Sequence, residues 1–107
     1  MRTIPGGFLP HTVTVEPYEG QGAHGRVYGT PRPVRCAVED QVRLVRGADG
    51  AERTSSTTVR CKPHHTIPPE SRVTVWPDTP HERVAEVITT ARRIYPGTPS
   101  HLEISLT

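Results

Sequence analysis

Between Val34 and Cys61 the sequence alternates apolar and polar side chains on both sides of one turn signal, Gly47-Ala48-Asp49-Gly50. Such alternation is typical of β-strands that have one buried face and one solvent-facing face. A turn between two alternating runs joins them as an antiparallel hairpin. A one-residue shift in their pairing would bury the charged side chains, so the stretch predicts a long hairpin in a defined register.

A four-residue loop at the turn predicts which residues face each other, and a two-residue Asp49-Gly50 turn would shift the partners by two but keep the same faces. With the four-residue loop, Cys36 faces Cys61 and Val38 faces Val59, with these apolar side chains on the inner face. Asp40 interrupts that face, and we expect a bulge or a bend there. The base of the hairpin is therefore predicted to lie in the core.

Toward the turn the inner face of the hairpin is no longer apolar. The same register pairs Val42 with Ser55, Leu44 with Arg53, and Arg46 with Ala51. Strands with so little apolar surface have little reason to stay packed on a core. We therefore expect residues 43–56 to form a projecting, mobile hairpin tip.

The composition agrees with a β fold. Val, Ile and Thr supply 31 of the 107 residues, against four Leu and six Ala, and twelve Pro and nine Gly interrupt the chain at short intervals. β-Branched residues favour strands, and frequent breakers are typical of short strands joined by turns. The length suits one domain. We expect a mainly β, small single-domain β-barrel or sandwich over residues 1–107, with at most one short helix.

Further strands follow from shorter alternating runs. Residues 12–15, 72–76 and 101–107 are predicted strands, and residues 95–98 are predicted to form a turn. Residues 81–94 fit either a strand or a helix, because Thr79 and Glu82 have the spacing of a helix cap while the following stretch is rich in β-branched residues. We favour the strand.

Two segments show no apolar pattern. Residues 1–10 are expected to be an N-terminal extension. Residues 18–30, rich in glycine, are expected to be a flexible loop that carries His24, Arg26 and Tyr28 as candidate contacts to other subunits or partners.

The two cysteines are too few for a disulfide scaffold and lack the spacing of a zinc ribbon. Facing each other on neighbouring strands, Cys36 and Cys61 could form a disulfide or remain core thiols; a reducing cytoplasm favours thiols. No apolar run reaches the length of a membrane span, and the first residues lack the layout of a signal peptide. We expect a protein made in the cytoplasm, without a membrane partner.

The sequence carries no strong signature of an enzyme or a cofactor. His64 and His65 with Cys61 and His81 are the best metal candidates, but adjacent residues on extended backbone point to opposite faces, so we favour a polar loop. No nucleophile motif or phosphate loop is present. We expect neither catalysis nor a bound cofactor or metal.

Nucleic-acid binding is the remaining sequence-based alternative. One face of the hairpin carries basic side chains, as in small barrels that bind nucleic acids. Carboxylates interrupt that face and it lacks aromatic residues for base stacking. The basic residues are Arg35, Arg43, Arg60 and Lys62, and the interrupting ones are Glu39 and Glu52.

Taken in order, several segments resemble the small head-to-tail connector proteins of tailed bacteriophages, of the head-completion or stopper type. The resemblance covers nearly the whole chain and rests on the order of short motifs in a protein of this length. They are Leu9-Pro10-His11-Thr12-Val13-Thr14-Val15, Tyr28-Gly29, Val34-Arg35-Cys36-Ala37-Val38-Glu39-Asp40, Ala48-Asp49-Gly50-Ala51-Glu52, Arg72-Val73-Thr74-Val75-Trp76 and Pro99-Ser100-His101-Leu102-Glu103-Ile104-Ser105-Leu106.

The resemblance implies a structural protein of the virion neck, assembled in the bacterial host cytoplasm. Such proteins form a homo-oligomeric ring beneath the portal and adaptor proteins, close the DNA-filled head, and offer a docking surface to a tail terminator or tail-completion protein. In some, a loop blocks the channel. Carried onto this sequence, the candidate gating and DNA-facing residues are Arg43, Arg46, Asp49 and Arg53, which would meet packaged double-stranded DNA through non-specific contacts.

Two alternatives stay open. One is a tail-completion or other neck subunit, which would bind the opposite side of the same joint. The other is a small nucleic-acid-binding β-barrel.

Overall fold

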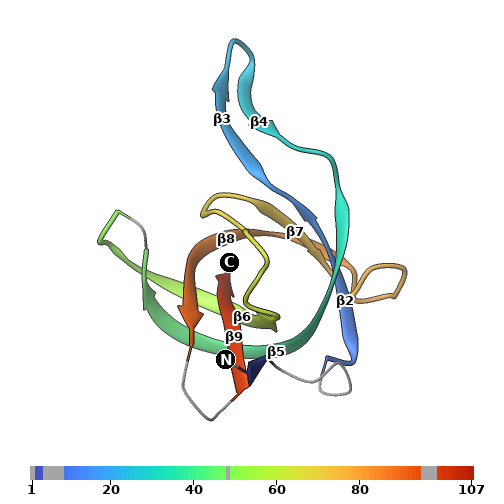
Figure 1. Cartoon of the computed structure of the whole chain (residues 1–107). Helices are drawn as coiled ribbons and strands as arrows, with labels where there is room; N and C mark the ends of the chain where they lie inside the picture. The colour runs from blue at the N-terminus through green and yellow to red at the C-terminus, as the bar shows by residue number, and fades with distance from the viewer. Residues whose placement is uncertain (1, 4–8, 48, 95–98) are drawn as a thin grey trace.

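The computed structural model describes residues 2–3, 9–47, 49–94 and 99–107 (Figure 1). All regular structure in these ranges is β, as the sequence predicts. The strands are β1 (Arg2–Thr3), β2 (His11–Glu16), β3 (Tyr18–Gly22), β4 (Gly25–Tyr28), β5 (Arg32–Arg46), β6 (Glu52–Cys61), β7 (Arg72–Val75), β8 (Arg83–Arg93) and β9 (Pro99–Leu106). No helix long and apolar enough to span a membrane occurs in the described part of the chain.

Six strands pair in a closed ring. Their order is β9-β6-β5-β2-β7-β8, all antiparallel, and β8 pairs back onto β9. Such closure removes the open edges of a sheet, as in a small β-barrel. The ring is visible end-on in Figure 1, and β1 adds to the outside of β9 in parallel. The expected mainly β single domain is confirmed.

The interior of the ring is filled by small and medium-sized apolar side chains. Val13, Val34, Val59 and Val73 come from different strands and are each 1 % exposed. Ile67, from the connection between β6 and β7, joins this core. Because only alternate residues of each strand face inward, a chain with few large apolar residues can still fill a narrow barrel.

The predicted register is confirmed at the base of the long hairpin. Cys36 pairs with Cys61 and Val38 pairs with Val59. Both cysteines are free thiols with no exposed surface. The expected bulge is also present, because the pairing shifts between Asp40 and Arg43.

Beyond the bulge the predicted pairs are wrong. Val42 does not face Ser55, because Arg43 does; Leu44 faces Thr54 rather than Arg53, and Arg46 faces Glu52 rather than Ala51. The bulge places one extra residue in β5, so every later partner moves by one. The loop between the strands is correspondingly longer than the four residues expected.

The extra residue also exchanges the two faces of β5. Before the bulge, even-numbered residues such as Cys36 and Val38 point inward and are buried. After it, Val42 and Leu44 lie on the outer face and are 74 % and 71 % exposed. Arg43 shares the inner face with buried Ser55, its cross-strand partner. The bulge thus moves two apolar side chains into solvent.

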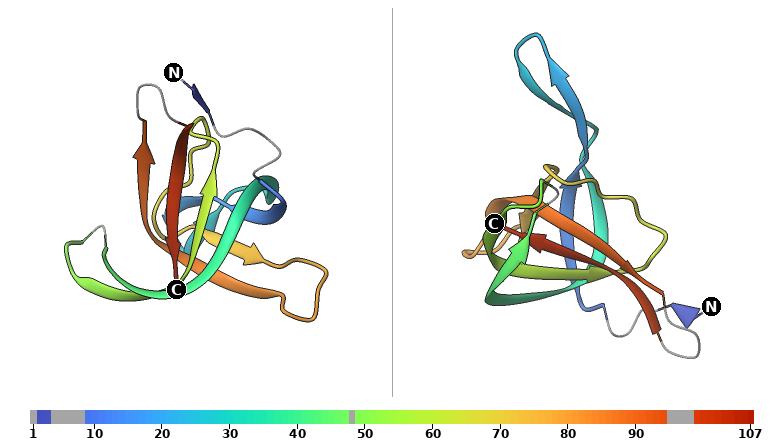
Figure 2. Two further views of the ribbon diagram at one scale, coloured as in Figure 1. Left: turned by 90° about the horizontal axis from the view of Figure 1, so that it is seen from below. Right: turned by 90° about the vertical axis from the view of Figure 1, so that its left-hand side faces the viewer.

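Residues 18–30 are not the irregular loop expected from the glycines. Tyr18 pairs with Tyr28 and Gly22 with Gly25, so β3 and β4 form a two-stranded hairpin that leaves the barrel (Figures 1 and 2). Gly20 and Gly25 adopt positive φ angles of 115° and 112°, which side chains disfavour. Since neither face of this hairpin enters the core, no apolar alternation marks it in the sequence.

Most of the other predicted elements are confirmed. Strands β2, β7 and β9 lie where they were expected, and residues 83–93 form strand β8, which resolves the ambiguity in favour of the strand. The cap-like spacing before it belongs to a turn, in which the Glu82 amide donates to the Thr79 carbonyl over 3.1 Å. The predicted turn at 95–98 and most of the extension at 1–10 lie outside the described residues.

Candidate interaction surfaces

The hairpin β3–β4 is anchored to the barrel by Arg26. Its guanidinium lies 2.6 Å from the Glu86 carboxylate on β8 and 3.3 Å from that of Glu70. The hydrogen bond from Arg26 to Glu86 raises the pKa of the guanidinium, so Arg26 is charged at any physiological pH. Arg26, which the sequence predicted as a contact to other subunits, therefore pairs with two carboxylates of its own chain.

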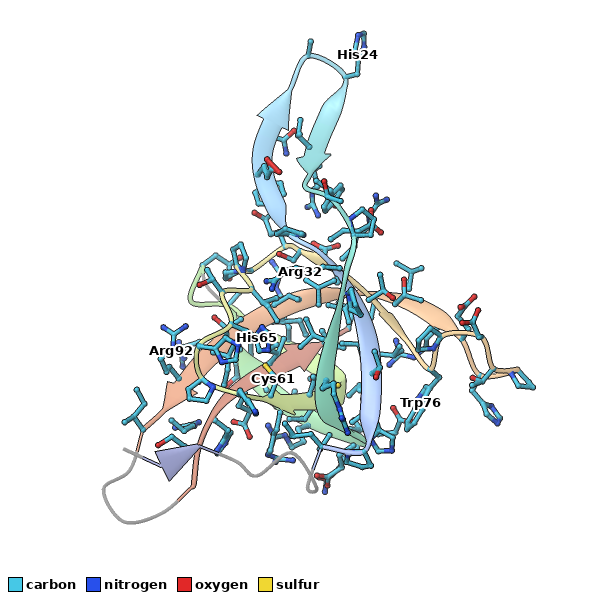
Figure 3. The ribbon with its side chains drawn as sticks, turned by 45° about the vertical axis from the view of Figure 1, so that its right-hand side comes forward. His24, Arg32, Cys61, His65, Trp76 and Arg92 are labelled. Atoms are coloured by element: carbon cyan, nitrogen blue, oxygen red, sulfur yellow. The ribbon has the colours of Figure 1, made fainter. Side chains whose placement is uncertain are left out.

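Tyr28 also makes internal contacts at the base of this hairpin. Its ring centroid lies 6.1 Å from that of Tyr18, in an edge-to-face arrangement. The Arg72 guanidinium lies 4.0 Å from the Tyr28 centroid and also pairs with Glu16 over 2.8 Å. These contacts stiffen the base of the hairpin. His24, by contrast, is exposed at its tip, away from the barrel (Figure 3).

Three of the four candidate gating residues meet in the hairpin tip, residues 43–56. Asp49 accepts hydrogen bonds from the Ala51 amide and from Arg53, both over 3.0 Å. These two contacts, the amide first, lower the pKa of Asp49. Arg46 donates to the Gly50 carbonyl over 2.9 Å. Asp49 therefore shapes the turn and pairs with Arg53, while Arg46, whose cross-strand partner is Glu52, makes no ion pair with a described residue.

Arg43 does not join that group. Placed on the inner face by the bulge, it is half-buried, and its Nε atom is buried without a hydrogen-bond partner in the described part of the protein. The prediction that Arg43 stands on the same solvent-facing side as Arg35 and Arg60 is wrong, because those residues lie on the other face of the hairpin.

The tip and the β3–β4 hairpin share one cavity. Its volume is about 280 Å³, and its lining includes Asp49 and Arg53 from the tip, Arg26 from β4, and Glu70, Glu86 and Ile88 from the barrel. Two candidate sites that are far apart in the sequence are therefore neighbours. Sequence reasoning could not place them together, because both segments reach the cavity from outside the ring of strands.

A second cavity, of about 570 Å³, was not anticipated. It lies around Trp76, whose indole Nε1 donates to Asp40 Oδ2 over 3.2 Å. The Thr57 hydroxyl donates to the other oxygen of Asp40, and Arg83 donates to Thr57. Trp76 has a positive φ of 53°, which is uncommon for an aromatic residue. The break in the apolar pattern at Asp40 was the only sequence signal of this network.

The histidines considered as metal ligands do not form a metal site. The rings of His64 and His65 lie 4.2 Å apart between centroids. Among the described residues, no three His, Cys, Asp or Glu side chains come close enough to hold one ion. Burial raises the pKa values of Cys36 and Cys61 to about 12 and about 11. A raised pKa lowers the fraction of reactive thiolate at neutral pH.

Comparisons of the chain with protein-family models, curated proteins and solved structures found no match. The function is therefore argued from the geometry. The described surface offers two projecting hairpins, exposed apolar side chains and arginines.

Proposed function

We propose that this protein is a structural subunit of the neck of a tailed bacteriophage, of the head-completion type. In that role it forms a ring beneath the portal and adaptor proteins, retains the packaged DNA and offers a surface to the tail. One observation carries the proposal: two paired ribbons, β3–β4 and the hairpin tip, leave a small closed barrel in different directions (Figure 1).

The projecting ribbons suit a subunit that reaches its neighbours. The molecule measures 46 × 33 × 26 Å, elongated for so small a chain. Ring contacts repeat around the axis, so a modest interface per subunit is sufficient in the assembled ring, provided that the contact closes. The base contacts of Arg26 and Tyr28 hold β3–β4 in place for such a contact.

Exposed apolar side chains favour a self-associating surface. Val42 and Leu44 are mostly exposed, on a stretch of β5 that has no strand partner on its β2 side in the described residues. An open strand edge with apolar side chains is a natural site for pairing with another chain. In a ring, that edge would be covered by the next subunit.

The hairpin tip is the proposed channel-closing segment. At its base, Ser55 and Ser56 donate hydrogen bonds to the carbonyls of Leu106 and Thr107. Beyond them, the pairs from Leu44–Thr54 to Arg46–Glu52 lie past the part of β6 that pairs with β9. Arg46 supplies a positive charge there and forms no ion pair with a described residue, although Glu52 is its cross-strand partner. When a ring brings several tips together, these charges would face the packaged duplex. The β3–β4 hairpin, which holds His24, is the second candidate for this segment.

Electron microscopy of particles made without this protein tests the proposal. A phage or prophage that carries this reading frame is given an early stop codon, and the lysate is examined with and without added purified protein. We expect separate tails beside heads that have lost their DNA, and rescue by the protein. Filled heads beside loose tails would assign the protein to tail docking, as for a tail-completion subunit. Normal infectious particles would overturn the neck role and favour the nucleic-acid-binding alternative.

A further inference from the structure

The connection that follows β6 carries a second group of basic residues, separate from the hairpin tip. Arg92 on β8 donates to the carbonyls of Pro63 and His65, both over 2.9 Å. On the other side of the same loop, Arg32 donates to the carbonyl of Thr66 over 2.9 Å. Figure 3 shows Arg32, His65 and Arg92 side by side along this loop.

Two further basic side chains complete the group. Exposed His64 stacks beside His65, and the His65 amide approaches the Lys62 carbonyl at 3.4 Å. Partial burial, followed by the charges of neighbouring basic groups, lowers the pKa of His65. Arg32, Lys62, His64, His65 and Arg92 are called the basic loop patch below.

No carboxylate neutralises this patch in the described structure. Its arginines are held by backbone carbonyls, which are neutral, and none of the ion pairs between described residues involves Arg32, Lys62 or Arg92. The residues outside the described ranges include no Asp or Glu. Arg60, on the strand that leads into this loop, by contrast contacts both Glu39 and Glu103, whereas Arg35 and Arg46 donate to backbone carbonyls as the patch arginines do.

The remaining side chains of the loop indicate what kind of partner the patch suits. Pro63 and Ile67 are buried, so they offer no exposed apolar groove to a peptide. The patch also lacks Phe, Tyr and Trp, on which the bases of a single strand would stack. What it presents is positive charge and hydrogen-bond donors, which is what the regular phosphates of a duplex require.

We propose that the basic loop patch binds the phosphate backbone of double-stranded DNA without sequence preference. The inference deepens the proposed function and rests on it only for the source of the DNA, which would be the packaged genome. It also separates two surfaces: the patch makes the phosphate contact in a single chain, whereas the hairpin tip acts when the ring brings several tips together.

Binding of a labelled random-sequence duplex, measured by fluorescence anisotropy at several salt concentrations, tests this assignment. We expect weak binding by the free chain, with a Kd of about 10⁻⁴–10⁻⁶ M at physiological salt. Each phosphate contact adds about 0.9 to the slope of log K against log salt. Lys62→Gln should therefore lower the slope by about 1, and Lys62→Gln combined with Arg92→Gln by about 2.

Matched variants and competitors keep the test decisive. Lys62 makes no side-chain hydrogen bond or ion pair with the described residues, so its variant should fold normally; thermal melting checks this. Arg72→Gln removes the same charge from an arginine that is paired with Glu16 and should leave the slope unchanged. A slope lowered by Arg46→Gln but not by Lys62→Gln would move the contact to the tip and overturn the inference. Polyglutamate that competes with DNA charge for charge would also overturn it, in favour of an acidic protein partner.

This test is independent of the particle experiment. If the patch does not bind DNA but the stop codon still yields heads without DNA, the neck role is retained and only the patch assignment is wrong. If DNA binding depends on salt and on Lys62 but particles made without the protein are normal and infectious, the patch assignment is confirmed and the neck role is excluded.

Discussion

Arg26 and Glu86 are 60 residues apart, yet a hydrogen bond of 2.6 Å joins the guanidinium of one to the carboxylate of the other. Arg26 belongs to the β3–β4 hairpin and Glu86 to the barrel, so this pair and the tyrosine contacts set the position of the hairpin. The two side chains are 37 % and 41 % exposed. Ion pairs so open to solvent contribute little to global stability.

We therefore predict a local effect for Arg26→Gln. Global stability should change by less than about 1 kcal/mol, because the pair is solvent-exposed. Hydrogen exchange in residues 18–28 should become faster, while exchange in β6 and β9 stays unchanged. A matched variant, Arg46→Gln, removes one arginine from the other projecting ribbon and should not alter exchange in residues 18–28. Unchanged exchange in the Arg26 variant would show that the tyrosine contacts alone hold the hairpin.

The bulge in β5 leads to a second prediction. Val42 and Leu44 are mostly exposed, so replacing both by Thr should change the free energy of unfolding by no more than about 0.5 kcal/mol for each site. If these side chains meet a neighbouring subunit, the variant should assemble poorly onto particles. As a control, Val59→Ala in the core should cost about 2 kcal/mol. Normal incorporation of the Thr variant into heads would exclude this edge as a subunit contact.

The thiols provide a third prediction. Cys36 and Cys61 are fully buried, and burial raises their pKa values to about 12 and about 11. Labelling by iodoacetamide at pH 8 should therefore be slow in the folded protein and fast in denaturant, because only the accessible thiolate reacts. His24→Cys places a reporter thiol at the exposed end of β3–β4 and should label rapidly. Fast labelling of the native pair would mean that the barrel opens at this point.

Acid sensitivity is a fourth prediction. Partial burial lowers the pKa of both His65 and His101 below 6.5. The unfolded chain then binds more protons than the folded one as pH falls through 6.5, so folded stability should decrease as the pH is lowered from neutral through 6.5. The urea midpoint at several pH values measures this. His65→Gln combined with His101→Gln should flatten the dependence, and an equally steep dependence in that variant would assign it to other groups.

The parts of this fold that could be predicted are those in which one face is buried. Cys36 opposite Cys61 follows from apolar alternation, since only one register buries those side chains and leaves the arginines outside. The hairpin β3–β4 could not be found in this way, because both of its faces meet solvent. The pairs beyond Asp40 differ from the prediction for another reason: the bulge adds one residue to β5, so every later residue has a partner one position away from the one that an unbroken register predicts.

The candidate sites could likewise be predicted only where their residues are close in the sequence. Asp49 with Arg53 is a local contact that the turn brings about, whereas Arg26 with Glu86 depends on where a ribbon folds in space. The basic loop patch likewise joins residues of β5, β8 and a loop. Its members could be identified as basic from the sequence, but the absence of a neighbouring carboxylate is visible only in three dimensions.

The hairpin tip provides the last prediction. Arg46→Glu together with Arg53→Glu reverses both charges at the proposed channel-closing segment, and removes the Arg53–Asp49 pair of 3.0 Å. Because both side chains are exposed and lie outside the barrel core, the variant should melt within a few degrees of the unaltered protein. Four carboxylates, those of Asp49 and Glu52 among them, would then face the duplex, and their repulsion of phosphate should let DNA escape from filled heads. The fraction of full heads, counted by electron microscopy, measures this.

Arg46→Gln with Arg53→Gln separates charge reversal from charge loss and should give an intermediate fraction. Heads that stay full in the Glu variant would exclude the tip as the gating segment and leave the β3–β4 hairpin as the remaining candidate.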